Sequence, residues 1–204
     1  GENMDRRKRK SRQAIITACI ELSKEKEFQQ VSIHEIVEKA DLNRGTFYLH
    51  FVDKADMMKS FEQEMLDKIE QVIINNIPDE ISYEVFMQSR YETIVQIIRC
   101  YEEHKELLRF ILNAGNTTSF QTELGEKIKT ILKDNIFPKV NLTEIAIPLD
   151  LVAMIFTSIS LNLAQYAYNA EEPLDVEANA QFLISIMLHG PLKTFGFLPE
   201  SYTS

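Results

Sequence analysis

The stretch that decides the fold runs from residue 32 to residue 54 and reads SIHEIVEKADLNRGTFYLHFVDK. It holds two short helical patterns joined by a four-residue break. Ser32 can cap the first helix, because its hydroxyl can accept a hydrogen bond from a free backbone N–H while Glu35 reaches back to the Ser32 N–H. Asp41 is expected to end this helix, since Asp tolerates the left-handed backbone of a tight turn. Asn43 can cap the second helix, so the stretch predicts a helix-turn-helix.

The second helix of this stretch is too short to exist for stability alone, because it cannot bury enough apolar area. Phe47 and Phe51 are expected to lie in the core. The polar side chains that point away from these two rings are Arg44, Thr46, Tyr48 and His50. Such an exposed polar edge indicates that the helix binds a ligand.

Six cationic side chains lie within seven positions near the N-terminus: Arg6, Arg7, Lys8, Arg9, Lys10 and Arg12. Such a cluster indicates phosphate binding, although basic N-terminal runs are often only solvated tails. Residues 1–60 hold 12 Lys+Arg against 10 Asp+Glu, whereas residues 61–204 hold 10 against 21, within a net charge of −9. A phosphate backbone would repel the acidic remainder, so only the N-terminal part is expected to approach DNA.

The run from Arg12 to Met58 closely resembles the DNA-binding domain of TetR/AcrR-type transcriptional regulators. The resemblance rests on a three-helix spacing, on Gly-Thr-Phe-Tyr-x-His-Phe at residues 45–51, and on the lysine at residue 54. It covers about a quarter of the chain. Two positions depart from the family pattern, since Glu27 and Asp41 stand where the family usually has glycine.

The resemblance implies that the second helix is a recognition helix that enters the major groove of double-stranded DNA. Arg44 is the best candidate for a base contact, because a guanidinium pairs with O6 and N7 of guanine, a contact worth about 1–3 kcal/mol of discrimination. Gly45 would let the helix backbone come close to the DNA. The other matched positions lie at the front of the helix or at phosphates: Ser32, Asn43, Thr46, Tyr48, His50 and Lys54. Packing under Phe51 is the alternative for Tyr48 and His50.

Beyond residue 53 further helical patterns follow, with breaks at Pro78, at Gly115-Asn116 and at Pro138. No alternation of period two is long enough for a strand. The sequence therefore predicts an all-α protein of about nine helices. A helix-turn-helix domain with a basic arm is expected at residues 1–52, and a larger helical ligand-binding and dimerisation domain at residues 53–204.

Residues 151–170 carry no charge over 20 positions, the length of a membrane span, but several Ser, Thr, Asn and Gln interrupt them. We therefore expect no membrane contact. On a helix they have a large apolar face and a small-residue face. Small side chains let two helices approach closely, so the small face and the next helix are expected to meet a second subunit. The residues of this interface are Ala153, Thr157, Ser160, Ala164, Ala167, Phe182 and Ile186.

The family resemblance implies that such a dimer would set two recognition helices against a roughly palindromic operator. It also implies a pocket for a small apolar or amphipathic inducer. Met and aromatic side chains suit an adaptable apolar pocket, although ordinary core packing is the alternative for each of them. The candidates are Met65, Phe86, Met87, Tyr91, Tyr101, Phe110, Phe120 and Met154.

Two other classes of protein remain as alternatives: a helical protein-interaction module and a helical enzyme. The run that begins at His34 starts like the zinc motif H-E-x-x-H, yet Glu38 stands in the place of the second histidine. Neither a metal nor a cofactor is expected. Cys19 and Cys100 are expected to be buried free thiols in a reducing cytoplasm. Glu21 interrupts the apolar run that would otherwise resemble a signal peptide. A ligand-responsive repressor is the function that the sequence favours.

Overall fold

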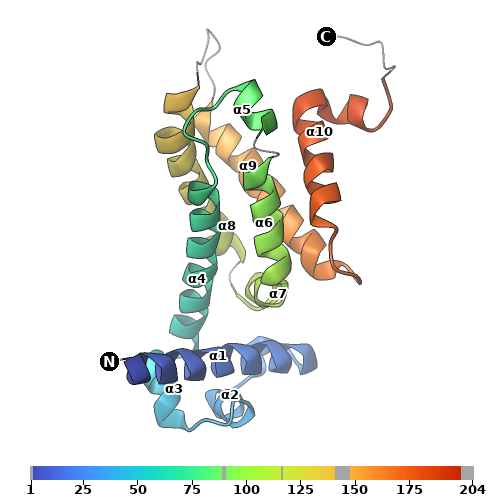
Figure 1. Ribbon diagram of the computed structural model, residues 1–204. Coiled ribbons are helices and arrows are strands. Elements are labelled where there is room, and N and C mark those ends of the chain that lie inside the picture. Colours follow the sequence, from blue (N-terminus) through green and yellow to red (C-terminus); the bar gives the residue numbers. More distant parts are fainter. Residues whose placement is uncertain (1, 89–90, 116, 141–147, 199–204) are drawn as a thin grey trace. The chain divides into compact units, whose positions relative to one another are not determined.

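The computed structural model describes residues 2–88, 91–115, 117–140 and 148–198, and every regular element in these ranges is helical, which confirms the all-α prediction. The N-terminal helices are α1 (Glu2–Glu25), η1 (Phe28–Gln30), α2 (Ile33–Lys39), α3 (Arg44–His50) and α4 (Lys54–Asn75). They are followed by α5 (Tyr83–Gln88), α6 (Glu92–Glu103), α7 (Lys105–Ala114), α8 (Thr117–Ile131), η2 (Leu132–Ile136) and η3 (Phe137–Lys139). The last two are α9 (Leu149–Asn169) and α10 (Val176–Thr194) (Figure 1).

The chain forms two compact units, of which the first comprises Gly1–Lys68 and His104–Gly125 and the second Ile69–Glu103 and Glu126–Ser204. This division differs from the boundary expected after residue 52. The reason is that α7 packs against α1 and shares the core of the N-terminal helices. A helix from later in the chain thus completes the first unit.

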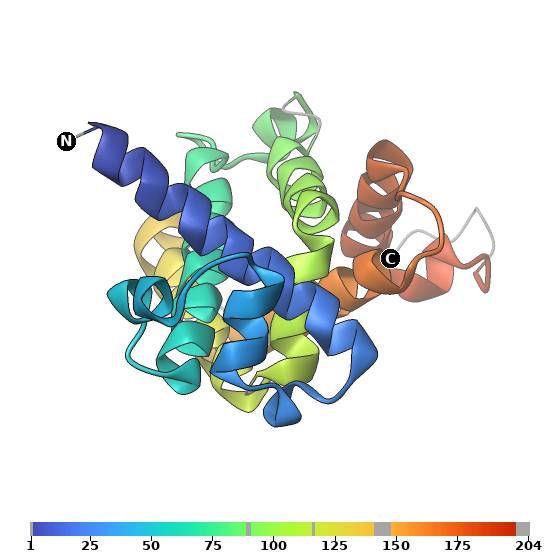
Figure 2. The same cartoon turned by 90° about the horizontal axis from the view of Figure 1, so that it is seen from below.

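The core of the first unit contains a continuous series of aromatic rings. Phe28 meets Phe110 edge to face with 4.8 Å between ring centroids, and Phe110 lies 6.4 Å from Phe61. Phe61 in turn meets Phe51 at 5.6 Å, and Phe51 meets Phe47 at 5.5 Å. Figure 2 shows α1 (dark blue) with α2 and α3 of this unit. The series links α3 to the buried centre of the unit, as aromatic pairs in this geometry stabilise a core beyond their buried area.

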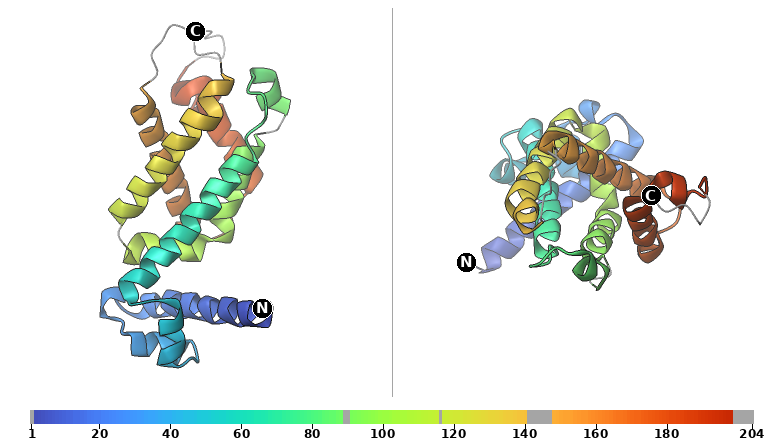
Figure 3. Two further views of the ribbon diagram at one scale, coloured as in Figure 1. Left: turned by 90° about the vertical axis from the view of Figure 1, so that its left-hand side faces the viewer. Right: turned by 90° about the horizontal axis from the view of Figure 1, so that it is seen from above.

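In the second unit α6 packs against both α9 and α10 (Figure 3). Val95 and Ile98 of α6 and Ala180 of α10 form a buried cluster, against which Leu183 packs. This core explains the strong amphipathic pattern of α6.

The small-residue face of α9 lies inside the chain, so the prediction that it meets another subunit is wrong. Four of its residues are buried, namely Ala153, Thr157, Ala164 and Ala167. The fifth, Ser160, shares a hydrogen bond with the Tyr101 hydroxyl of α6. The close approach that small side chains allow is used by α6 of the same chain. The exposed side of α9 instead carries large apolar side chains, namely Leu151, Met154, Ile155, Phe156, Ile159 and Tyr166.

Candidate nucleic-acid interface

The start of α2 is fixed by the capping box that the sequence predicts. The Glu35 N–H donates to Ser32 Oγ at 3.1 Å, and the Ser32 N–H donates to Glu35 Oε2 at 2.8 Å. Lys26 also pairs with the Glu35 carboxylate. The hydrogen bond from Lys26, followed by the backbone hydrogen bond from Ser32, lowers the pKa of Glu35 to about 2. The carboxylate therefore stays ionised at neutral pH and holds α2 in place.

The turn between α2 and α3 also follows the sequence signals. Asp41 adopts the expected left-handed backbone with φ of 55°. Asn43 Oδ1 accepts hydrogen bonds from the Thr46 N–H at 2.8 Å and from Thr46 Oγ1 at 3.0 Å, which caps α3. A Cβ on Gly45 would lie only 3.3 Å from Asn43 Oδ1. Glycine at this position thus leaves room for the cap, a role that sequence reasoning missed.

One face of α3 is buried and the other faces solvent. Phe47 is fully buried, whereas Arg44, Tyr48 and Leu49 are exposed. The Arg44 guanidinium donates to the Tyr48 hydroxyl at 3.2 Å and lies 5.5 Å from the centre of its ring. The predicted base-contacting residue and a predicted phosphate-contacting residue therefore lie together on the exposed surface of the short helix.

His50 connects α3 to α1. Its Nε2 lies 2.7 Å from Ser11 Oγ, a distance at which the two groups share a hydrogen bond. Burial lowers the pKa of His50, and the positive charges of Lys8 and Arg12 lower it further. The neutral ring is therefore favoured at neutral pH, and His50 is placed to hydrogen-bond rather than to act as a cation.

Lys54 has a structural task that the sequence did not reveal. Its Nζ donates to the carbonyl of Phe28 at 2.9 Å and to that of Val31 at 2.6 Å, and it lies 4.6 Å from the centre of the Phe28 ring. Desolvation lowers the pKa of this amine. Two of its three N–H donors are engaged inside the first unit. We therefore revise its expected role from phosphate contact to anchor of residues 28–31.

The basic cluster of α1 divides into surface and interior members. Five of its side chains are exposed: Arg6, Arg7, Lys8, Arg9 and Lys10. Arg12 instead pairs with Glu64, donates to Ser60 Oγ at 3.0 Å, and lies 5.2 Å from the centre of the Phe61 ring. The sequence could not separate Arg12 from its neighbours, because Glu64 lies 52 positions away.

Residues 15–61 match the family model described as bacterial regulatory proteins, tetR family. Over these residues the chain matches the TetR-type DNA-binding region. A Bacillus subtilis (strain 168) protein described as an uncharacterized HTH-type transcriptional regulator, YxbF, is 23% identical over 105 residues, or 50% of this chain. The matched segment spans only 27% of that relative.

Two solved structures described as TetR-family regulators share the fold. The protein from Syntrophomonas wolfei str. Goettingen is 20% identical, with a TM-score of 0.66 over 95% of this chain and 99% of its own. PfmR from Thermus thermophilus is 16% identical, with a TM-score of 0.62 over 86% of this chain and 97% of its own. At these identities the likeness concerns the fold, and it extends beyond the TetR-type helix-turn-helix to most of the chain.

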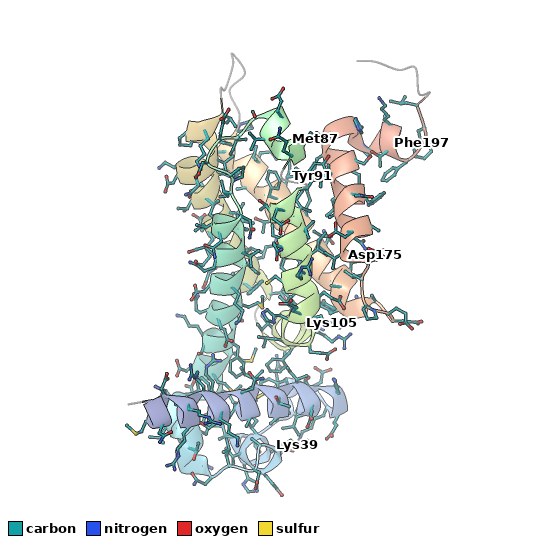
Figure 4. All side chains as sticks on the ribbon, viewed as in Figure 1. Lys39, Met87, Tyr91, Lys105, Asp175 and Phe197 are labelled. Atoms are coloured by element: carbon teal, nitrogen blue, oxygen red, sulfur yellow. The ribbon has the colours of Figure 1, made fainter. Side chains whose placement is uncertain are left out.

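The candidate pocket residues are divided between the two units. Met65, Phe110 and Phe120 are buried in the first unit, whereas Tyr101 is buried in the second. Met87 and Tyr91 contact each other through a hydrogen bond from the Tyr91 hydroxyl to the Met87 sulfur at 2.8 Å (Figure 4). Met154 is exposed on α9, and the side chain of Phe86 lies outside the described residues.

The second unit has an open apolar groove of about 550 Å³ along α9 and α10. It is lined by Leu151, Met154, Ile155, Ser158, Ile159, Asn162, Leu163 and Leu183, of which only Met154 was a predicted pocket residue. In the part of the chain that the structure describes, no three His, Cys, Asp or Glu side chains gather closely enough to hold a metal ion. The groove is apolar and lies on the exposed side of α9.

Proposed function

We propose that this chain is a homodimeric transcriptional repressor that binds a roughly palindromic operator and leaves it when a small apolar or amphipathic ligand binds. The observation that carries the proposal is the division of α3 into a buried side, at Phe47, and an exposed side, at Arg44 and Tyr48. Five exposed cations of α1 belong to the same unit and supply charge for a phosphate backbone.

In this proposal each exposed polar group near α3 has its own role. Arg44 contacts a base edge, because its fork of N–H donors matches guanine. Gly45 allows close approach of the backbone to the DNA. The groups that hold the domain in register on phosphates are Ser32, Asn43, Thr46, Tyr48 and His50. Lys54 is left out of this set because its ammonium serves backbone carbonyls.

The second copy of the chain is proposed to cover the large apolar face of α9 and the neighbouring face of α10. Met154, Ile155 and Tyr166 on α9 each expose half or more of their surface, and Phe182 on α10 nearly as much. Large apolar side chains exposed in such number mark an interface with another protein or a membrane. By length and composition alone α9 could cross a membrane. We favour a second copy because the other side of α9 packs on α6.

The interface prediction is tested by the oligomeric state of the full chain in sedimentation. Met154→Glu should turn a dimer into a monomer, because two charged groups would be buried at the two-fold interface. Met4→Glu is the matched control, since Met4 is similarly exposed on α1. A wild-type monomer, or a Met154→Glu variant that remains dimeric, would contradict the proposed interface.

DNA binding is tested by selecting bound duplexes from a random pool with the full chain. We expect two symmetric half-sites and an affinity that falls steeply between about 50 and 200 mM salt. Arg44→Ala should relax the base preference at one position of each half-site. Lys133→Ala, which removes one exposed positive charge from the second unit, should leave the preference intact. Absence of any selected sequence would favour a helical protein-interaction module.

The sign of regulation is tested with the selected operator placed over a reporter promoter in the cytoplasm, where we expect the protein to act. A repressor lowers reporter output when it is expressed. Release by a ligand is proposed from the family alone, and a screen of apolar and amphipathic compounds would find those that restore the output. Increased output on expression would identify an activator instead.

A further inference from the structure

Leu49 stands out on the recognition helix because it is a large apolar side chain that exposes 79% of its surface. Phe47, two positions earlier, exposes 0%. Two residues correspond to about 200° around a helix, so Leu49 lies on the side of α3 opposite the buried ring. Gly45 lies two positions before Phe47 and therefore on the same outer ridge, one turn before Leu49. Leu49 is thus a large, exposed apolar side chain on the outer side of α3.

The surroundings of Leu49 on α3 point to nucleic acid rather than to another apolar surface. Arg44 and Tyr48 flank the ridge and hold each other through a hydrogen bond and a cation–π contact. A guanidinium and a phenolic hydroxyl are groups that can bind phosphates and base edges. The absent side chain of Gly45 lets the first turn of the ridge come close to the groove, and Leu49 follows on the next turn. An apolar side chain is therefore presented where polar base edges would be read.

We propose that Leu49 enters the major groove and selects thymine at one position of each operator half-site by contact with its C5-methyl group. The proposal rests on the proposed function of α3. Thymine carries an apolar methyl group beside its O4 acceptor in the major groove, whereas guanine, adenine and cytosine present only donors and acceptors there. Leucine has neither donor nor acceptor, so it would remove water from those polar edges without replacing the lost hydrogen bonds. Only thymine gains from the contact.

The experiment removes the methyl group and nothing else. Operators selected by the full chain are resynthesised with deoxyuridine in place of thymidine, one symmetric pair of positions at a time. Burial of one methyl-sized group changes an affinity about fourfold, so two half-sites should give about fifteenfold. We expect this loss at one pair of positions for the wild type, and no loss there for Leu49→Ala.

Two variants make the assignment specific. Val52→Ala alters an equally exposed apolar side chain just beyond the end of α3, and it should keep the full uracil penalty. Leu49→Ala should keep the melting temperature of the wild type, since Leu49 contributes little to the core. It should also keep the base preference that Arg44→Ala abolishes.

The outcomes separate this inference from the function on which it rests. If no sequence is selected from the pool, the proposed DNA binding fails and Leu49 loses its role with it. If operators are selected but uracil weakens Leu49→Ala as much as the wild type at every position, the DNA-binding proposal stands and the thymine contact of Leu49 is wrong.

Discussion

Replacement of Lys54 by methionine separates the anchor role of this residue from a phosphate contact. Methionine keeps an unbranched apolar stem but removes the ammonium that donates to the Phe28 and Val31 carbonyls. The structure places both carbonyls at the short η1 turn that joins α1 to α2. Loss of the ammonium should therefore loosen this turn and, with it, the support of the helix-turn-helix.

The cost follows from the contacts of Lys54. Hydrogen bonds to a charged group contribute about 1.5–3 kcal/mol each, and the lower end applies because Lys54 is half-buried. The cation–π contact with Phe28 adds about 0.5–1 kcal/mol, while relief of the desolvation that lowers the pKa of the amine offsets part of the loss. We expect a net loss of about 2–3 kcal/mol. For a chain of this length that corresponds to a melting temperature lower by ~4–12 °C.

The assay compares thermal unfolding and the salt dependence of operator binding. Lys59→Met is the matched control, since Lys59 is exposed on the same helix and its replacement should change stability by less than about 0.5 kcal/mol. Below both melting temperatures, Lys54→Met should keep the wild-type salt slope. An unchanged melting temperature together with a slope smaller by about 0.9 per half-site would refute the anchor role and restore the phosphate contact.

Three further predictions concern the helix caps and the buried thiols. Asn43→Ala should lower the free energy of unfolding in urea by about 1 kcal/mol through loss of the α3 cap, while Asn43→Asp should retain most of it, and equal midpoints for all three proteins would contradict the capping role. Because the folded-state pKa of Glu35 is about 2, below its ordinary value of about 4.3, its ionised form stabilises the fold above about pH 4.3. Glu35→Gln should then be less stable than the wild type at neutral pH, and the difference should vanish as the pH falls from about 4.3 to about 2 in acid titrations followed by circular dichroism. Burial raises the pKa of Cys19 to about 12, so neither Cys19 nor the buried Cys100 should react with iodoacetamide before unfolding, and native labelling seen by mass spectrometry would disprove their burial.

The local features of the interface could be predicted because their partners are close in sequence. Ser32 and Glu35 lie three positions apart, as do Asn43 and Thr46, and the structure pairs them as expected. The left-handed backbone at Asp41 is likewise a property of one residue and its turn. Because these partners lie only three positions apart, the sequence alone predicts where the helices of the helix-turn-helix begin and end.

The contacts of individual Arg and Lys side chains could not be predicted, because their partners are distant in sequence and come close only in the folded chain. Arg12 and its neighbours look alike in the sequence, yet Arg12 alone among the six is held by Glu64 and Ser60 of α4. Lys54 matches a family position, but the carbonyls that it serves belong to residues 28 and 31. A list of basic residues therefore overestimates the charge that is free to meet phosphates.

The faces of α9 illustrate a second limit of sequence reasoning. Its pattern shows that more than one side of the helix must be covered, since no charge occurs over 20 positions. It does not show which side is covered by the same chain. The partner of the small face is α6, whose own apolar stripe is equally compatible with other neighbours. A protein core and a subunit interface are built from the same kinds of apolar side chains. Only the arrangement of the helices shows which of the two a given side chain belongs to.

The recognition helix is too short to hold its own conformation, so its function depends on where its neighbours fix it. Phe47 enters the core, His50 meets Ser11 of α1, and Asn43 closes the first turn. A side chain that is held by such a contact is less free to contact DNA. The side chains that remain at the surface are the ones that can contact bases. On this argument Arg44 and Leu49 should determine the operator sequence together, Arg44 through hydrogen bonds to a base and Leu49 through apolar contact with a thymine methyl group.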